Sequence, residues 1–458
     1  MMRRTWWAIG LGLALGPACG DRVPSGDGAG DGSSEGSISD SQSGGSSAVT
    51  NGGSGSGSAD STTANSSSPG TSEGSEGSEG GNPIKLDLGI IPDAGKGQGG
   101  CYGPGKGMNP DDPEFSYIWI ANSSQGTISK LDTQTVTEVG RFITRPDSAG
   151  SPSRTSVSLS GNVAVANRNG GVTKIYANVE DCVDANGNGS IDTSDDATFL
   201  PWGQDECVAW HAPFNYASQR PVAWAQGDLN PVTCEWNNER LWTSGNNSGA
   251  IDVLLLDGDT GVVLDQVAPV GLVSDFYGLY GGAVDGEGNL WATQLGSANR
   301  LIRVDIDTLD YDIYFPPSGP WWYGMTVDSD GYVWMCSSTA ARFDPMTETF
   351  QTAMVGGYTG CMAASGPDGL LWMSTGSGVV GVNRQTLAVE ANWPTAGSYG
   401  ISIDYYGYVW AVANGNSAHR VDPDTGTVVS YNGLSGAYTY SDMTGYALAY
   451  AGGGAPSG

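Results

Sequence analysis

The segment YGISIDYYGYVWAVA at residues 399–413 decides the fold, because variants of it recur along the chain from residue 115 onward. Each copy has a short apolar stretch, a turn that contains Asp or Gly, and an apolar strand with a tryptophan. The other clear copies are YGGAVDGEGNLWATQ (280–294), YGMTVDSDGYVWMCS (323–337) and CMAASGPDGLLWMST (361–375). Two further strands follow a copy, as in AHRVDPDTGTVVSY (418–431), where the DPDT turn is a hairpin signal.

A repeat of roughly forty residues with four short strands per copy is typical of a β-propeller. Trp242 marks a fifth copy, and two divergent copies at 117–132 and 156–175 bring the number of blades to seven. Ala164 replaces the tryptophan in the second divergent copy. The regular place of the tryptophans in their strands predicts packing between blades. They are Trp242, Trp291, Trp334, Trp372 and Trp410.

The first copy starts at its tryptophan strand and therefore lacks an opening strand. The segment YTYSDMTGYALAY at 438–450 has the pattern of that missing strand, with an extension. A C-terminal strand in the first blade closes the ring and leaves no exposed sheet edges. We therefore predict an all-β fold over residues 115–450, a monomeric seven-bladed β-propeller of four-stranded blades closed by the C-terminal strand.

Several blade sequences resemble the repeat of the virginiamycin B lyase (streptogramin lyase) family. They are CMAASGPDGLLWMS followed by GVVGVNRQT, AVDGEGNLWATQ, and RLIRVDIDT. The resemblance implies a lyase that opens a cyclic depsipeptide antibiotic by elimination, with magnesium and with histidine and glutamate near the channel mouth. This chain has two histidines: His211 in an insertion and His419 in the third strand of the last full blade. A lyase with altered catalytic residues is therefore the alternative to a binding module.

Charge excludes one class of partner. The chain has 458 residues, with 49 acidic and 19 basic side chains and a formal net charge of −30. Such a surface repels phosphate backbones, so we expect no nucleic-acid partner.

The N-terminus indicates export. Arg3 and Arg4 precede a short apolar run, and GPAC, which ends at Cys19, resembles the lipobox of bacterial lipoproteins. We expect residues 1–19 to be a lipoprotein signal, with lipidation at Cys19 and a membrane partner through that lipid. The alternative is a plain secretory signal cleaved nearby. Either leader places the protein outside the cytoplasm, and the lipoprotein places it in the bacterial cell envelope, at the outer membrane or cell surface.

The rest of the chain outside the repeats is divided by composition. Residues 20–81 are rich in Ser, Gly and acidic residues and almost free of apolar ones, so we expect a disordered tether. Residues 82–114 form a pre-propeller segment, and residues 451–458 a flexible tail. An insertion at 180–220 lies between the second and third blades.

Six cysteines remain if Cys19 carries lipid, and an even number in an exported protein indicates disulfides. Six cysteines allow 15 pairings. Proximity in sequence favours Cys182 with Cys207 and Cys336 with Cys361, which leaves Cys101 with Cys234.

The start of each innermost strand lies at one rim of the channel. Alignment of the copies places several tyrosines and two arginines there: Arg154, Arg220, Tyr280, Tyr323, Tyr399 and Tyr440. Tyrosine presents an apolar face and a hydroxyl to a ligand, and arginine presents a planar fork to a carboxylate. These residues predict a ligand-binding mouth. The alternative is that the tyrosines pack where the blades converge and the arginines pair with local acids.

The stretch DANGNGSIDTSD at 184–195 has the ligand spacing of a calcium loop, and glycine at its sixth position allows the sharp turn. The expected ligands are Asp184, Asn186, Asn188, Ser190, Asp192 and Asp195. The closing aspartate resembles the dockerin version of the EF-hand loop. We expect structural calcium that holds the insertion together with Cys182–Cys207; the alternative is a polar turn without metal.

We therefore expect an exported, lipid-anchored binding module of the cell envelope. Its ligand, a sugar, a peptide or a protein, lies at the channel mouth. The enzyme alternative is a carbon–oxygen lyase, and a third alternative is an interaction protein that uses its rim without a small ligand.

Overall fold

The computed structural model describes residues 116–452, apart from Pro231, Cys234, Ser248, Ser274, Gly319, Tyr358 and Thr359. The signal at 1–19 with Cys19, the tether at 20–81, the segment at 82–114, the Cys101–Cys234 pair and residues 453–458 lie outside the described residues. Within the described part, no helix is long and apolar enough to cross a membrane.

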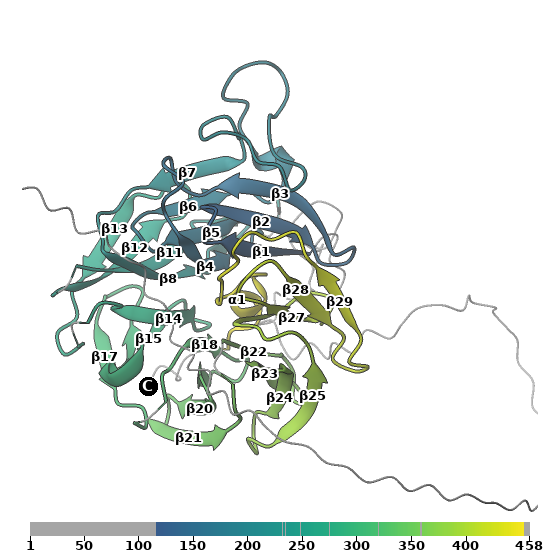
Figure 1. The fold of residues 1–458 in the computed structure, drawn as a ribbon. Coiled ribbons are helices and arrows are strands. Elements are labelled where there is room, and N and C mark those ends of the chain that lie inside the picture. The colour runs from purple at the N-terminus through teal and green to yellow at the C-terminus, as the bar shows by residue number, and fades with distance from the viewer. Residues whose placement is uncertain are drawn as a thin grey trace, which may run out of the picture. The chain divides into compact units, whose positions relative to one another are not determined.

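Seven sheets form a ring around a central channel, as the sequence repeat predicted (Figure 1). Each is a blade of antiparallel strands in sequence order from the channel outward. The innermost strands contact one another in succession around the axis. The chain therefore forms a seven-bladed propeller, and each blade presents the start of its innermost strand to the same face.

The strands of the first three blades have the following bounds. Blade 1 contains β1 (Tyr117–Asn122), β2 (Thr127–Asp132) and β3 (Thr137–Ile143). Blade 2 contains β4 (Pro152–Val157), β5 (Val163–Asn167), β6 (Val172–Ile175) and β7 (Val208–Ala212). Blade 3 contains β8 (Ser218–Ala225), β11 (Arg240–Asn246), β12 (Ile251–Asp257) and β13 (Val263–Val267), with the small hairpin β9 (Asp228–Leu229) and β10 (Trp236–Asn237) inserted after β8.

The other four blades are regular. Blade 4 contains β14 (Leu279–Val284), β15 (Leu290–Gln294), β16 (Leu301–Val304) and β17 (Tyr311–Tyr314). Blade 5 contains β18 (Gly324–Val327), β19 (Val333–Cys336), β20 (Thr339–Asp344) and β21 (Thr349–Met354). Blade 6 contains β22 (Cys361–Ala363), β23 (Leu370–Thr375), β24 (Gly378–Asn383) and β25 (Val389–Pro394). Blade 7 contains β26 (Gly400–Ile403), β27 (Val409–Val412), β28 (Ala418–Val421) and β29 (Val428–Tyr431).

Burial explains the sequence pattern of the strands. The second strand of a blade lies between two neighbouring blades, so both of its faces are buried and it is apolar without alternation, as in β19. The outermost strands face solvent and are mostly polar, as in β21. The repeat tryptophans belong to the buried class; Trp242, Trp334 and Trp410 are fully buried.

A shared turn fixes the tryptophan in three blades. The indole N–H of Trp291 donates to Asp285, that of Trp334 to Asp328, and that of Trp410 to Asp404, at 2.7 to 2.9 Å. The same carboxylates accept backbone N–H groups of the turn that follows the innermost strand. The Asp and the Trp six residues later are therefore one structural unit, which is why they recur together.

The C-terminal segment closes the ring, as predicted. Ala437 forms a bridge to Asn122 in β1, and the N–H of Tyr438 donates to the carbonyl of Ala121 at 3.0 Å. The N–H of Trp119 donates to the carbonyl of Met443 at 2.9 Å. Residues 437–443 thus complete blade 1 on its channel side, and Figure 1 shows the last blade beside the first.

The extension of that segment is a short helix, not a strand. Helix α1 (Tyr446–Tyr450) follows Gly445, whose φ of 86° is left-handed. Tyr446, Leu448 and Tyr450 are buried, and α1 lies at the centre of the ring (Figure 1). Beyond it, the N–H of Gly452 donates to the carbonyl of Asp328 at 2.8 Å. The C-terminal chain therefore covers the end of the channel opposite the tyrosines.

The insertion lies inside blade 2, not between blades 2 and 3 as the sequence suggested. The excursion runs from β6 to β7, and β7 pairs with β6 as the outermost strand of the blade. The expected span 180–220 therefore includes β7 and the start of β8. A five-residue strand that follows about thirty irregular residues carries too little pattern to be separated from them.

Two disulfides match the expected pairs. Cys182–Cys207 joins the start of the insertion to the residue before β7. Cys336–Cys361 joins the end of β19 in blade 5 to the start of β22 in blade 6. Both bridges close loops of 25 residues in sequence separation.

Candidate functional site

The sequence-predicted mouth residues converge at one end of the channel. Arg154 lies in β4 and Arg220 in β8, Tyr280 is the second residue of β14, and Tyr323 and Tyr399 directly precede β18 and β26. Tyr440 lies in the closing segment. The ring centroids of Tyr323 and Tyr440 are 4.2 Å apart, and Tyr280 lies 5.4 Å from Tyr323 and 5.7 Å from Tyr440.

Tyr438 is the hydroxyl hub of this group, which sequence alignment did not identify. Its hydroxyl lies 3.1 Å from the hydroxyls of Tyr280 and Tyr440 and within hydrogen-bond distance of that of Tyr323. Tyr438 and Tyr440 are two residues apart, so an extended chain turns both toward one face. That spacing was the available signal. We call Arg154, Arg220, Tyr280, Tyr323, Tyr399, Tyr438 and Tyr440 the mouth cluster.

The arginines stack on tyrosine rings. The Arg154 guanidinium lies 3.3 Å from the ring centroid of Tyr440 and 4.5 Å from that of Tyr280. Its Nε donates to the carbonyl of Tyr280 at 3.1 Å. Arg220 lies 5.0 Å from the Tyr280 centroid. Arg168, which follows β5 and was not predicted, lies 4.9 Å from the Tyr438 centroid. Cation–π contacts of this kind are stronger where water is excluded.

The tyrosines of the mouth cluster differ in pKa, and the arginines contribute to the difference. Burial raises the pKa of Tyr280, but the adjacent Arg154 and Arg220 outweigh it and lower that pKa to about 8. Burial raises the pKa of Tyr323 and of Tyr440 well above the ordinary value. Tyr280 is therefore the most acidic phenol of the three. The two guanidinium groups outweigh burial at Tyr280, whereas burial outweighs them at Tyr440.

The mouth cluster fills the end of the channel. Arg154 has no exposed surface, and Tyr280, Tyr323 and Tyr440 are each 3 to 5% exposed. Ring packing and hydroxyl contacts leave the partly exposed Tyr399 and Tyr438 nearest to solvent. The tyrosines that alignment placed at the rim thus form a packed floor, above which any ligand would lie.

Exposed aromatic side chains surround this floor on one side. The described part of the chain exposes five aromatic residues, and four of them lie on the two loops that flank blade 4, at 268–278 and 315–323. These four, the aromatic rim, are Phe276, Tyr277, Phe315 and Trp321. Both loops join one blade to the next on the tyrosine face. The Tyr277 ring contacts the Tyr280 ring edge-on at 5.7 Å, so the aromatic rim meets the mouth cluster at Tyr277.

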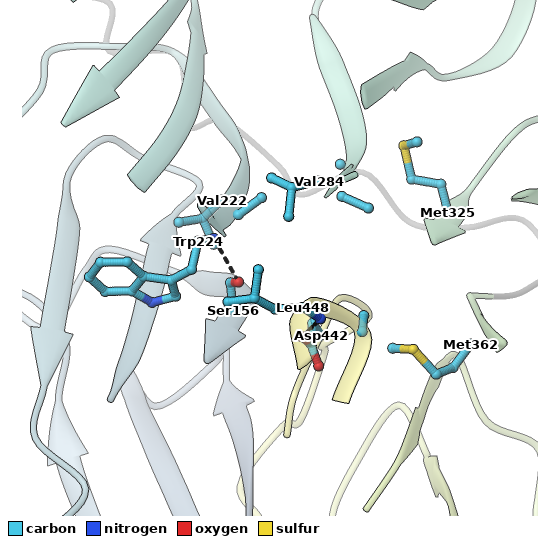
Figure 2. A pocket seen from close by; sticks show the side chains of 12 residues that line it. Ser156, Val222, Trp224, Val284, Met325, Met362, Asp442 and Leu448 are labelled. Carbon is cyan, nitrogen blue, oxygen red and sulfur yellow. Dashed lines mark hydrogen bonds between the residues drawn. The ribbon is translucent and has the colours of Figure 1, made fainter. Parts of the chain in front are cut away.

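A small cavity lies between the innermost strands and α1 (Figure 2). Its volume is about 20 Å³, enough for one water molecule. Ser156, Met325, Met362, Asp442 and Leu448 line it. Burial raises the pKa of Asp442 to about 6, although backbone N–H groups of the α1 turn bind its carboxylate. This cavity is therefore too small for an organic ligand.

The residues of the loop in which calcium was expected, at 184–195, turn toward one another. Asp184 accepts the backbone N–H groups of Gly187, Asn188 and Gly189 at 2.6 to 3.2 Å. Gly187 and Gly189 have φ values of 71° and 88°, which suit glycine at these two positions. The amide groups of Asn186 and Asn188 both donate to Asp192 at 2.8 and 2.9 Å. The carboxylate and amide oxygens of these side chains are ligands of the type that calcium prefers.

Two other expected ligands and one residue outside the loop make different contacts. The hydroxyl of Ser190 donates to the Asn188 side chain at 2.7 Å, and Asp195 is exposed. Glu206, which sequence reasoning missed, accepts the backbone N–H groups of Ala185, Asn186 and Asp192. Across the described residues, no three His, Cys, Asp or Glu side chains gather as a metal site. Three of the six expected ligands, Asn186, Asn188 and Ser190, belong to other residue types.

The two histidines lie away from the mouth cluster. His211 is in β7, the outermost strand of blade 2, where its Nδ1 lies 2.8 Å from Thr173 Oγ1. His419 is in β28, the third strand of blade 7, where its Nδ1 lies 2.8 Å from Ser430 Oγ. Burial lowers the pKa of both. Neither side chain belongs to an innermost strand.

The sequence matches no protein-family model. No curated protein matches it either. Solved structures resemble it at low identity. A catalytically inactive variant of virginiamycin B lyase from Staphylococcus aureus with quinupristin is 15% identical, with 69% of this chain and 88% of that chain covered and a TM-score of 0.43. A streptogramin B lyase is 17% identical, with 62% and 83% covered and a TM-score of 0.39. Apo AztD from Citrobacter koseri is 11% identical, with 71% and 97% covered and a TM-score of 0.43. The fold of this chain rests on its own strand pairing, and the activities in these names belong to those proteins.

Proposed function

We propose that this protein is an exported, lipid-anchored binding module of the bacterial cell envelope, with its ligand at the channel mouth. The observation that carries the proposal is the concentration of exposed aromatic residues in the aromatic rim, directly beside the mouth cluster. Aromatic side chains supply contact area at low entropic cost, and patches of them mark interaction sites. The packed floor beneath them gives such a ligand a rigid support.

Binding at the mouth is tested with the full chain on arrays of glycans and peptides. We expect a signal that falls in Tyr277→Ala and in Trp321→Ala, because both side chains lie on the aromatic rim. Val429→Ala, at an exposed apolar position of β29 on the outside of blade 7, is the matched control and keeps the signal. Equal signals in all three variants would place the ligand elsewhere.

The lyase alternative is tested in the same preparation. A cyclic depsipeptide incubated with the protein and magnesium keeps its mass but loses its ring if elimination occurs. We expect the ring to stay intact, because neither His211 nor His419 lies near the mouth cluster. Ring opening that is lost in a mouth variant would show that the protein is an enzyme and not a binding module. If arrays and depsipeptide are both silent while pull-downs from envelope extracts return one partner, an interaction protein that uses its rim is the better account.

The anchor is a separate part of the proposal. Cys19 follows a lipobox-like sequence, and the tether at 20–81 is long and polar enough to hold the propeller away from a membrane. Metabolic labelling with a fatty acid in a bacterial host tests it. We expect label on the full chain and none on Cys19→Ser, which keeps any plain secretory route. Label on both, or on neither, would refute lipidation at Cys19.

We also propose that calcium binds at 184–195 and stabilises the insertion. The convergence of Asp184, Asn186, Asn188 and Asp192 supports it. A ligand that binds only the folded state raises the melting temperature with concentration. We expect calcium to raise the melting temperature of the chelator-treated full chain, magnesium to do so less, and Asp184→Ala to lose the rise. Asp259→Ala, an exposed carboxylate of blade 3, is the control that retains it. No rise with calcium would leave a polar turn held by Cys182–Cys207.

A further inference from the structure

Three arginines meet at the mouth without an acidic partner. Within the described part of the chain, none of the ion pairs involves Arg154, Arg168 or Arg220. In contrast, Arg384 pairs with Asp328 at 2.8 Å, and Arg141 pairs with Glu138 at the same distance. A chain with a net charge of −30 has carboxylates in excess. A local surplus of positive charge in such a protein needs an explanation.

The arginines form a gradient of burial toward solvent. Arg154 has no exposed surface, Arg220 is 6% exposed, and Arg168 is partly exposed. Two of their donor groups, Arg154 Nη2 and Arg220 Nε, are buried without a hydrogen-bond partner. Burial lowers the pKa of Arg168, and the nearby positive charge of Arg220 lowers it further. The unpaired donor of Arg220 and the repulsion between like charges both cost free energy that an anion would recover.

The aromatic rim provides apolar surface beside these arginines. Tyr277 lies between the two, with its ring centroid 5.7 Å from the Arg220 guanidinium and 5.3 Å from the Phe276 ring. Trp321 and Phe315 lie on the second loop that flanks blade 4. A ligand that binds beside Arg220 can therefore also contact Tyr277 and Phe276, which suits a molecule with an apolar body and a small anionic group.

We propose that the mouth binds a carboxylate, which accepts hydrogen bonds from Arg168 and Arg220, while the apolar body of its ligand lies on the aromatic rim. The charge of Arg154 beneath the floor adds attraction without contact. The planar guanidinium fork matches the two oxygens of a carboxylate. This inference rests on the proposed function and names the ligand class of the same site. The carboxylate is either that of a small aromatic acid or that of a peptide C-terminus.

Calorimetric titration of the full chain separates these sources. The probes are 3-phenylpropionate, as a small acid, and N-acetyl-glycyl-phenylalanine, as a peptide C-terminus, each with the corresponding primary amide. A charge-assisted hydrogen bond contributes enough that we expect each acid that binds to do so about tenfold or more tightly than its amide. Binding of both acids indicates recognition of the carboxylate alone, and binding of the peptide acid only adds recognition of the peptide backbone. Both outcomes support the inference.

Variants identify the arginines. Arg220→Gln and Arg168→Gln are expected to reduce the difference between acid and amide to within about twofold, because they remove the charge that distinguishes the two. Arg145→Gln is the matched control on the same face, since Arg145 already pairs with Asp147 at 3.1 Å, and it keeps the difference. Thermal melts check folding. If Arg220→Gln does not fold, the partly exposed Arg168→Gln carries the test alone.

Three outcomes would overturn the carboxylate inference. The first is equal affinity for acid and amide; loss of both in Tyr277→Ala would then leave the proposed mouth site standing with a neutral ligand. The second is equally effective displacement of the acid by inorganic phosphate, which would mean that the site responds to negative charge in general. The third is no binding of any probe at millimolar concentration; the array experiment with Tyr277→Ala and Trp321→Ala then decides the proposed function separately.

Discussion

Asp404 gives the sharpest stability prediction. It has no exposed surface, and its carboxylate accepts the Trp410 indole N–H at 2.7 Å and two backbone N–H groups of its turn. The equivalent Asp328 has Arg384 at 2.8 Å, whereas no ion pair of the described residues involves Asp404. Burial therefore outweighs the hydrogen bonds and raises the pKa of Asp404 to about 7. The perturbation is Asp404→Asn, which removes the titrating group.

The sign and size follow from linkage. The folded protein holds the Asp404 proton more tightly than the unfolded chain does, where the ordinary pKa is 3.8. The stabilising contribution is therefore complete below pH 3.8 and is lost as the pH rises through about 7. At 1.36 kcal/mol for each pKa unit, this gap corresponds to roughly 4 kcal/mol of unfolding free energy. Asp442, whose pKa of about 6 is raised by burial, adds a smaller loss of the same sign.

Denaturant unfolding at a series of pH values between 4 and 8 measures the effect. We expect the unfolding free energy of the native chain to fall with pH and that of Asp404→Asn to fall by roughly 4 kcal/mol less. Trp410→Phe is the matched control. It removes the indole donor but keeps the carboxyl group, so it lowers stability and keeps the fall with pH. The fall is expected to become larger, because the lost indole hydrogen bond had lowered the pKa of Asp404. Parallel slopes for the native chain and Asp404→Asn would refute the argument that burial controls this carboxyl group.

Three further predictions concern the disulfides, the channel plug and the mouth cluster. Replacing the cysteines of either Cys182–Cys207 or Cys336–Cys361 by alanines removes a cross-link with a separation of 25 residues. Chain entropy therefore predicts about the same loss of unfolding free energy for each, roughly 3.5 kcal/mol, measured by denaturant unfolding. A far smaller loss for Cys182–Cys207 would mean that the insertion unfolds independently. Leu448→Ala enlarges the buried cavity of about 20 Å³ and is expected to cost about 2 to 5 kcal/mol, against less than about 0.5 kcal/mol for the exposed Val429→Ala; equal costs would show that α1 does not pack into the channel. Ultraviolet titration of the phenols should reveal one tyrosine with a pKa of about 8, which is assigned to Tyr280 by its loss in Tyr280→Phe. Arg154→Gln should raise that pKa. If every phenol ionises in the ordinary range or above it, the pairing of Tyr280 with the arginines is contradicted.

The repeat made the fold predictable in detail. Each copy carries its own strand order, turn and tryptophan, and the Asp–Trp unit that produces this pattern is a local contact within one blade. The missing opening strand of blade 1 also predicted closure, because a propeller without it would expose a sheet edge. Alignment of the copies then gave the register of the innermost strands, and with it the place of Tyr280 and Tyr323.

The features that the sequence did not reveal depend on long-range contacts. YALAY at 446–450 is a five-residue apolar run that suits a strand or a helix, and only the channel end that receives it determines the helix. The burial of the mouth cluster depends on Tyr438 and Tyr440, which arrive from the far end of the chain. Arg168 follows β5, outside the aligned innermost strands, and reaches the mouth cluster only because blades 1 and 2 are neighbours around the ring.

The central claim is that the mouth face is where this protein meets its ligand. The most direct test places a photo-crosslinking amino acid at position 321 or at position 429 of the full chain and irradiates the protein in its native envelope. Trp321 is 49% exposed on the aromatic rim, and Val429 is 40% exposed on the outer strand of blade 7. We predict a discrete cross-linked product from position 321 and none from position 429. The same products from both positions, or a product from position 429 alone, would contradict the claim.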